Sequence, residues 1–356
     1  MTAKMFQKRK ALKIAYLSLV ALLLVWTVGS WLFVKSFYDS NFARLEQAKY
    51  SGFLRYSDVS GYPRSVIQFN SGENKLTAYI CGEENQKGLV VISHGLGYGA
   101  EDYLAQTLYF VDHSWRVFTF DNTGVYQSEG KSQVGLSQSS IDLNAALAYI
   151  EKDPTLSKLP LMLYGHSWGG YAVTAVLNYD HNITAVVSIA GFNTPNELML
   201  EDAKSEMGLF AYLEYPFMVK YQSRLFGDSA KLSAVEGINR VDTPVMIIHG
   251  TGDESISYTG ASIISHRAEI TNPNVVHQTI STQNHNGHKS LFKSDAALNY
   301  ADQLNQEYQN INDQYNGNIP DEVKGEFYAG INKSLASQLD MNFMDGINYF
   351  LESQLP

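Results

Sequence analysis

The sequence predicts an α/β protein built on an open, mostly parallel sheet with helices on both faces. Short apolar runs rich in β-branched residues alternate with helical stretches over most of the chain, and several of these runs end at glycine or aspartate. Continuous apolar runs are typical of parallel strands that are buried on both faces. Alternation of strands and helices in turn predicts right-handed crossovers that place helices on both sides of the sheet.

The N-terminal residues predict a membrane-spanning helix. Residues 14–34, "IAYLSLVALLLVWTVGSWLFV", carry no charged side chain, and a helix needs about 20 apolar residues to cross a bilayer. Residues 1–13 contain five basic side chains and no acidic one, which predicts a cytoplasmic segment by the positive-inside rule. We therefore expect a single-pass signal anchor in the cell membrane, with an extracytoplasmic body. A signal peptide cleaved after "VGS" is the alternative.

A connector and a folded domain follow the predicted anchor. Residues 35–61 form a polar and aromatic connector, and residues 62–304 are expected to form the α/β domain. Its first element is a predicted β-hairpin, "SVIQFNSGENKLTAYIC", with "SGEN" as the turn. The further strand candidates are "GLVVISHG", "RVFTFD", "LPLMLYG", "TAVVSIAG", "TPVMIIHG" and "VVHQTI". The clearest helix candidate runs from Ser137 to Lys152 and ends before Pro154.

Two segments depart from the alternation of strands and helices. Residues 192–240 separate two predicted strands and include "GLFAYLEYPFMVKYQSRLF". Since a segment of this length is too long for a structureless loop in a compact domain, we expect a small helical cap. Residues 305–356 hold a polar linker and end in amphipathic stretches. They predict a C-terminal helical extension whose last helix packs on the sheet.

Composition limits the classes of partner. The formal net charge is -10, from 26 basic and 36 acidic side chains, and an acidic body argues against a nucleic-acid partner. Cys81 is the single cysteine, so it cannot form an intrachain disulfide, and it is expected to be a small buried residue. The sequence leaves the oligomeric state open and gives no sign of a bound cofactor.

The stretch "LYGHSWGG" at residues 163–170 places Ser167 between glycines. The pattern G-x-S-x-G is weak by itself, because it occurs by chance in roughly one protein in ten of this length. Here a predicted strand, "PLML", precedes it and a predicted helix, "YAVTAVLNY", follows. A strand, a sharp turn and a helix in this order lift a serine oxygen above the sheet and direct a helix N-terminus towards it. Ser167 is therefore the predicted nucleophile.

A serine hydroxyl needs a base, and the base needs an orienting group. Asp253 follows the strand "VMIIHG" by a short turn and is the predicted acid, with the adjacent Glu254 as its competitor. The segment "ISTQNHNGHKS" supplies His285 and His288. We prefer His288 as the base, since Gly287 lets the backbone turn the imidazole inward, and His285 is the alternative. The H-x-x-H spacing lacks an accompanying helix or carboxylate cluster, so no metal site is predicted.

Backbone N–H groups are expected to stabilise the oxyanion of a tetrahedral intermediate. The loop "ISHGLGYG" offers the Leu96 amide, and Trp168, directly after the serine, offers a second one. His94 and His166 are interpreted as hydrogen-bonding scaffold. Asp121, in the turn "DNTGVYQSEG", is expected to hold that loop in place.

With these motifs in this order, the sequence resembles the α/β-hydrolase superfamily, and within it the serine aminopeptidase S33, lysophospholipase and esterase branch. The resemblance rests on His94-Gly95, Asp121 with Gly124, Gly165-x-Ser167-x-Gly169, His249-Gly250 leading to Asp253, and Gly287-His288, within residues 66–304. It implies an eight-stranded sheet, a cap after the sixth strand and acyl transfer to water through an acyl-enzyme. The doubled histidine in "NHNGH" departs from the family pattern.

These observations predict a serine hydrolase that cleaves a carboxylic ester, with an acyl ester or lipid-like substrate favoured. The predicted anchor would place the site beside lipid, and the cap is rich in large apolar side chains, although these would also serve to bury the cap against the sheet. They are Phe210, Tyr212, Tyr215, Phe217, Met218, Tyr221 and Phe226. The alternatives are aminopeptidase-like amide hydrolysis and a non-catalytic, membrane-tethered binding protein on a hydrolase scaffold.

Overall fold

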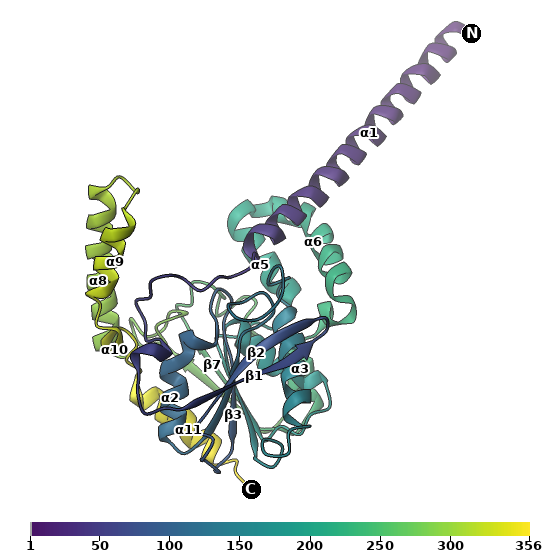
Figure 1. Ribbon diagram of the computed structural model, residues 1–356. Helices are drawn as coiled ribbons and strands as arrows, with labels where there is room; N and C mark the ends of the chain where they lie inside the picture. The colour runs from purple at the N-terminus through teal and green to yellow at the C-terminus, as the bar shows by residue number, and fades with distance from the viewer. Residues whose placement is uncertain (1) are drawn as a thin grey trace.

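The computed structural model describes residues 2–356, with side chains from residue 5 onwards. Met1, at the start of the predicted basic segment 1–13, lies outside the described residues. The body is built around one eight-stranded sheet with the strand order β1-β2-β4-β3-β5-β6-β7-β8. Figure 1 shows a long N-terminal helix, α1, projecting from this body, and an arm formed by helices α8 and α9 on the other side.

The sheet is mostly parallel, as predicted. Its strands are β1 (Arg64–Ser71), β2 (Asn74–Cys81), β3 (Leu89–Ser93), β4 (Arg116–Phe120), β5 (Leu161–His166), β6 (Ala185–Ile189), β7 (Val245–Gly250) and β8 (Val275–Ile280). The first two strands form the expected antiparallel hairpin, and β2 pairs antiparallel with β4. All later pairings are parallel, so the carboxyl ends of β3 to β8 lie at the same edge of the sheet.

Helices cover both faces of the sheet, which explains why its central strands are apolar throughout. One face packs against α3 (Gln138–Ile150), α4 (Trp168–Ala175) and α7 (Ala234–Arg240). The other face packs against α2 (Leu104–Asp112) and the C-terminal helix α11 (Met341–Glu352). Burial of apolar side chains on both faces is the main stabilising contribution to such a layered fold.

The connection between β6 and β7 is helical. It contains α5 (Pro195–Met207), α6 (Ala211–Phe226) and α7. Helices α5 and α6 pack on the carboxyl edge of the sheet, where Trp168 and Tyr171 belong to the same buried cluster as Met199 and Met218. This position puts the helices predicted as a cap next to the turn that carries Ser167, while the exact limits of the cap stay a prediction.

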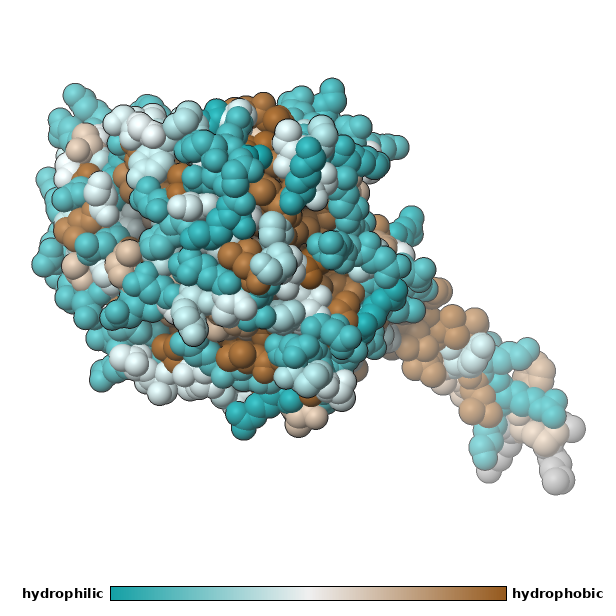
Figure 2. Space-filling view, turned by 90° about the horizontal axis from the view of Figure 1, so that it is seen from below, coloured by the Kyte–Doolittle hydropathy of each residue, from teal (hydrophilic) through white to brown (hydrophobic). Residues whose placement is uncertain are grey.

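Helix α1 (Thr2–Asn41) is a single helix of 40 residues. Among the described residues, its stretch Met5–Asn41 is the one helix long and apolar enough to cross a membrane. Most of its side chains are exposed, and Figure 2 shows hydrophobic atoms along it beside a mainly hydrophilic body. The helix continues past residue 34, where the predicted span ends, because its last turns pack against the body.

Helix α6 is the partner of α1 from Trp26 onwards, which includes the end of the predicted span. The ring centroids of Trp26 and Phe217 lie 5.2 Å apart. Further along, the buried Tyr38 hydroxyl donates a hydrogen bond of 2.5 Å to Gln222 Oε1. The Gln222 side-chain nitrogen then donates to the Ser137 hydroxyl at 2.9 Å, just before α3. Because Gln222 and Ser137 are fully buried, this chain of hydrogen bonds fixes α1 to the domain.

The C-terminal residues form two units. Helices α8 (Asp295–Gln314) and α9 (Asp321–Ala329) lie side by side in the arm, where the rings of Tyr308 and Phe327 are 5.1 Å apart. After the short α10 (Lys333–Ala336), helix α11 returns to the sheet. There the Trp115 indole N–H donates to Asn348 Oδ1 at 2.7 Å, and Leu351 is fully buried.

The docking of α11 predicts a loss of stability when its buried face is truncated. Leu351→Ala removes a fully buried side chain and should lower the free energy of unfolding by about 2 to 5 kcal/mol, because the surrounding core cannot close the cavity. The measurement is denaturant unfolding of the full chain in detergent, followed by circular dichroism. Tyr349→Ala is the matched control, since Tyr349 is 75% exposed. Equal losses in the two variants would contradict the docking of α11.

Candidate active site

Ser167 lies at the turn between β5 and α4 with an unusual backbone conformation. Its φ is 58° and its ψ is -117°, a region that costs a non-glycine residue about 1 to 3 kcal/mol. The surrounding structure holds it there: the Ser167 N–H donates to the Ile189 carbonyl at 2.8 Å, and its carbonyl accepts from the Tyr171 N–H at 3.0 Å. The side chain is half-buried and stands above the carboxyl edge of the sheet.

The glycines around Ser167 are required by close contacts between backbones. A Cβ atom at Gly169 would lie 1.9 Å from the Ser93 carbonyl oxygen on β3. A Cβ atom at Gly165 would lie 2.1 Å from the Gly169 carbonyl oxygen. Both distances are far below any real contact, so α4 can start this close to β3 and β5 only when glycine occupies both positions.

Three predicted side chains meet above the sheet. The Ser167 Oγ lies 2.8 Å from His288 Nε2. On the other side of the imidazole, His288 Nδ1 lies 2.8 Å and 3.0 Å from the two oxygens of Asp253. Asp253 follows β7 and His288 follows β8, so neighbouring parallel strands deliver both groups to the edge where β5 places the serine.

The two competing residues have other partners. His285 Nε2 lies 2.8 Å from Asp295 Oδ1, at the start of α8, so the structure does not bring this imidazole to Ser167. The Glu254 carboxylate accepts the backbone N–H of His288 at 2.9 Å. It therefore positions the loop that carries His288, whereas Asp253 contacts the imidazole.

The Asp253 carboxylate is buried and held as an anion. Burial alone would raise its pKa, but hydrogen bonds from His249 and His288 outweigh that effect and keep the pKa well below its usual range. The backbone N–H groups of Ser255 and Ile256 also donate to it, at 2.9 Å and 2.8 Å. A stable negative charge at this position favours a protonated Nδ1 on His288, which leaves Nε2 free to accept a proton from Ser167.

Sequence reasoning missed the contact of His249 with this carboxylate. His249 Nε2 lies 3.1 Å from Asp253 Oδ2 and 2.9 Å from the Ile256 carbonyl oxygen, with its side chain fully buried. Since both neighbours accept hydrogen bonds, Nε2 carries the proton and donates to them. The spacing of four residues between His249 and Asp253 spans the end of β7 and a turn, so the contact depends on the geometry of that turn.

A second hydrogen-bond chain connects the loops around Ser167. The Gly95 N–H donates to the Tyr103 hydroxyl at 3.1 Å, and this hydroxyl lies 2.8 Å from His166 Nδ1. His166 Nε2 lies 2.9 Å from the His288 carbonyl oxygen. A carbonyl only accepts, so Nε2 carries the proton and Nδ1 accepts from Tyr103. Burial, with the nearby His288, lowers the pKa of His166 to about 3, consistent with this neutral tautomer.

The predicted oxyanion donors line a cavity of about 240 Å³ together with Ser167 and His288. Within residues 2–356, neither the Leu96 N–H nor the Trp168 N–H donates to another group of the chain. Trp168 is the first residue of α4, where helical N–H groups have no intrahelical acceptor. Both donors are therefore available to an oxygen atom bound in the cavity.

The walls of this cavity are mainly apolar, with one carboxylate. The apolar side chains include Leu136, Phe192, Leu198 and Ile256. Asp202, on α5, also lines the cavity. Burial, together with the charges of neighbouring glutamates, raises the pKa of Asp202 to about 6.

The sheet, its order of strands and the serine turn define an α/β-hydrolase fold. Residues 84–234 match the family described as serine aminopeptidase, S33. An esterase from Pyrococcus furiosus aligns with a TM-score of 0.52 and 17% identity, over 70% of this chain and 91% of that one. The chain is an enzyme with an α/β-hydrolase fold and is similar to S33 serine aminopeptidases over the matched residues.

Two further solved structures are similar. Est1E from Butyrivibrio proteoclasticus, solved with ferulic acid bound, gives a TM-score of 0.49 and 17% identity over 68% of this chain and 97% of its own. An acylaminoacyl peptidase from Pyrococcus horikoshii gives a TM-score of 0.47 and 15% identity over 66% of this chain and 39% of its own. No curated protein sequence matches the chain.

The buried His94 predicts that the folded state becomes less stable as the pH falls. Its Nδ1 lies 2.9 Å from the Gly95 carbonyl oxygen and its Nε2 accepts the Asn122 N–H at 3.1 Å, and burial lowers its pKa to about 4. An unfolded histidine titrates near pH ~6.5, so below that pH the unfolded state binds a proton that the folded state does not. The stabilisation present above pH ~6.5 is therefore lost as the pH falls towards 4, by up to about 1.4 kcal/mol per pH unit.

The measurement is the melting temperature between pH 7 and pH ~4.5 for the wild type and for His94→Asn. The variant should melt lower at pH 7 but lose less with acidification, since its side chain does not titrate. Parallel curves for the two proteins would show that His94 does not contribute to the pH dependence.

Proposed function

We propose that the protein is a membrane-anchored serine hydrolase that cleaves a carboxylic ester through an acyl-enzyme on Ser167. The observation that carries this proposal is the hydrogen-bonded line from Ser167 Oγ through His288 to Asp253, with 2.8 Å on each side of the imidazole. A serine in a strained turn, an imidazole and a buried carboxylate in this order are the parts that acyl transfer needs.

In the proposed mechanism, the Ser167 oxygen attacks the ester carbonyl while His288 Nε2 accepts its proton. Asp253 orients the imidazole and stabilises its positive charge. The N–H groups of Leu96 and Trp168 stabilise the oxyanion of the tetrahedral intermediate. The intermediate collapses as His288 donates the proton to the leaving alcohol. Water, deprotonated by the same imidazole, then attacks the acyl-enzyme. His288 returns this proton to the Ser167 oxygen as the second tetrahedral intermediate collapses and the acid is released.

An ester with an apolar acyl group is supported by the apolar lining of the cavity next to Ser167. One observation favours aminopeptidase-like hydrolysis as a second candidate: Asp202 presents a carboxylate to the same cavity, and a carboxylate is a suitable partner for a substrate amine. Rates for a 4-nitrophenyl ester and an aminoacyl 4-nitroanilide, compared on the same preparation, decide between the two.

Labelling with a fluorophosphonate probe tests the proposed nucleophile and base. The full chain in detergent should label, Ser167→Ala should not, and His288→Ala should label and turn over an ester at least ~10³-fold more slowly. His285→Ala is the matched control and should keep wild-type labelling, because its imidazole bonds to Asp295. A folded wild type that stays unlabelled would favour the binding-protein alternative, and loss of labelling in His285→Ala would reassign the base.

We also propose that α1 is a retained anchor with the N-terminus in the cytoplasm. Two side chains that a cleavage after "VGS" would remove contact the body of the protein. Trp26 stacks edge-on against Phe217, and the Ser30 hydroxyl donates to Glu214 at 3.0 Å. The basic residues at the start of the chain support a cytoplasmic N-terminus.

Protease added to intact cells tests this orientation. The protease should digest the body and leave a short fragment from the N-terminus, because the body would lie outside the membrane. An N-terminal epitope tag should become accessible only after the membrane is permeabilised. Full protection of the body in intact cells, with digestion after permeabilisation, would contradict the proposed orientation.

A further inference from the structure

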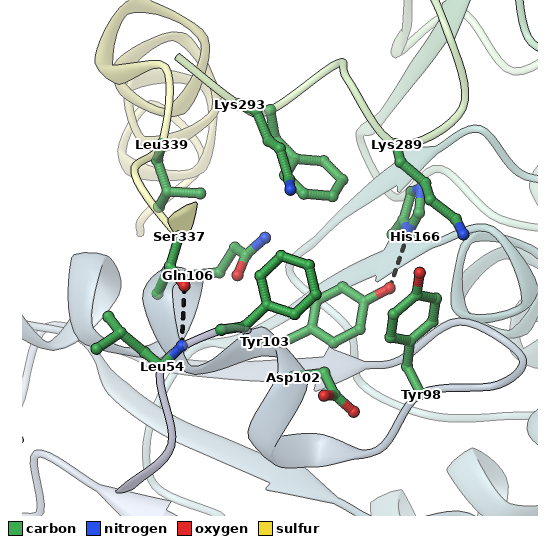
Figure 3. A pocket seen from close by; sticks show the side chains of 13 residues that line it. Leu54, Tyr98, Asp102, Tyr103, Gln106, His166, Lys289, Lys293, Ser337 and Leu339 are labelled. Carbon is green, nitrogen blue, oxygen red and sulfur yellow. Dashed lines mark hydrogen bonds between the residues drawn. The ribbon is translucent and has the colours of Figure 1, made fainter. Parts of the chain in front are cut away.

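A second cavity, of about 90 Å³, adjoins the one that contains Ser167. The two cavities share Tyr98, His166 and Lys289 as lining residues. Figure 3 shows the second cavity from close by, with His166 and Lys289 on one side and Leu339 on the opposite side. The second cavity therefore lies next to a substrate held at Ser167, across Tyr98 and Lys289.

Segments from both ends of the chain complete this second cavity. Phe53 and Leu54 come from the connector after α1, and Ser337 and Leu339 come from the segment between α10 and α11. These residues lie outside the residues 84–234 that match the S33 family. The cavity is thus built partly from segments that this chain adds around the matched region.

The charges that face the cavity are mainly positive. Lys289 and Lys293 both line it. The Lys289 ammonium group lies 5.4 Å from the Tyr98 ring centroid. The Lys293 ammonium group lies 4.6 Å from the Phe53 ring centroid. Over residues 5–356, neither the exposed Lys289 nor the half-buried Lys293 forms a salt bridge, whereas the half-buried Lys87 and Lys333 pair with carboxylates. Burial, and then the charge of Lys289, lower the pKa of Lys293, as expected for a cation without an anionic partner.

One carboxylate, that of Asp102, lines the same cavity, and one of its oxygens accepts hydrogen bonds from two neighbouring loops. Asp102 Oδ2 accepts the Gly99 N–H at 2.7 Å and the Tyr126 hydroxyl at 2.7 Å. Asp102 forms no salt bridge with either lysine within the described side chains. Two ammonium groups against one engaged carboxylate leave a net positive charge for a ligand, in a chain whose total charge is -10.

Neutral polar groups are also available in this cavity. Gln106 is 3% exposed, and within the described side chains the buried Tyr164 hydroxyl has no hydrogen-bond partner. The Ser337 hydroxyl accepts the Leu54 N–H at 2.9 Å, drawn as a dashed line in Figure 3, and its own proton is free to be donated. The Gln106 amide and the Ser337 hydroxyl can therefore each donate a hydrogen bond to a ligand in the cavity.

We infer that this cavity binds an anionic group, a carboxylate or a phosphate, carried by the substrate of Ser167. The inference rests on the proposed hydrolase function and narrows its substrate class to esters that bear such a group. The size of the cavity agrees, because a cavity of about 150 Å³ holds a benzene molecule, so a smaller one holds an anionic group with a short stem. Lys293, Gln106 and Ser337 contact the anion, and Lys289 lies between it and the reacting ester.

Matched pairs of esters test this inference on the full chain in a non-ionic detergent. On the acyl side, 4-nitrophenyl hemiglutarate is compared with 4-nitrophenyl pentanoate. On the leaving-group side, phenyl butyrate is compared with its 4-carboxy and 4-phosphonooxy derivatives. The wild type should show a kcat/KM about tenfold higher for at least one anionic ester than for its neutral partner, because a charge-assisted contact forms only with the anion. The derivative with the highest kcat/KM shows whether the cavity prefers a carboxylate or a phosphate.

Two variants test whether a preference for anionic esters arises from this cavity. Lys293→Met and Gln106→Leu should each bring the ratio of kcat/KM between the anionic and neutral esters close to one. Lys158→Met is the matched control, since Lys158 is exposed and lies outside the cavity, and it should keep the wild-type ratio. The inference is overturned if no anionic ester is preferred, or if the preference persists in Lys293→Met.

A binding measurement separates this inference from the proposed hydrolysis. Ser167→Ala cannot form the acyl-enzyme, so titration calorimetry with 4-nitrophenyl hemiglutarate reports binding alone. The dissociation constant should rise about tenfold when Lys293→Met is added to Ser167→Ala. If the wild type hydrolyses no ester, the proposed function is wrong, but this titration still shows whether the second cavity binds an anion. Equal affinities in the two variants would overturn the anion site even in an active esterase.

Discussion

The close contact between the start of α4 and the ends of β3 and β5 is the constraint on which the site depends. With no side chain at Gly165 or Gly169, the backbone of α4 reaches the Ser93 carbonyl, and this approach forces Ser167 into a positive φ. The strain is offset by burial of both faces of the sheet, where the central strands are fully covered. Across the described residues, the same approach leaves the Trp168 N–H without an acceptor at the edge of the cavity.

Much of this arrangement was predictable because its signals are local. The strands of the parallel sheet are runs of β-branched and apolar residues, and the glycine turn, Asp253 and His288 each follow such a run. Parallel strands share one carboxyl edge, so residues that follow them converge without further information. The choice between His288 and His285 was less secure, since it depends on which imidazole the loop after β8 turns inward and on the position of Asp295.

Features that depend on distant segments could not be predicted. Tyr103, just before α2, contacts His166 at the end of β5, and no spacing in the sequence signals that pair. The second cavity needs Phe53 and Ser337 to meet, although hundreds of residues separate them. The packing of α1 on α6 could not be predicted from the sequence either. An apolar helix predicts a membrane span whether or not part of it also contacts the protein.

The hydrogen bonds from Tyr38 through Gln222 to Ser137 have a mechanical consequence. A domain on a flexible linker can adopt any orientation relative to the bilayer. A domain that is fixed to its membrane helix by buried hydrogen bonds keeps one tilt angle relative to the membrane. If α1 spans the membrane as proposed, the body and the helix rotate together about the membrane normal, and the body cannot move away from the helix. The mouth of the site then sweeps a ring at a constant height, and the enzyme samples the surface of one leaflet as it diffuses.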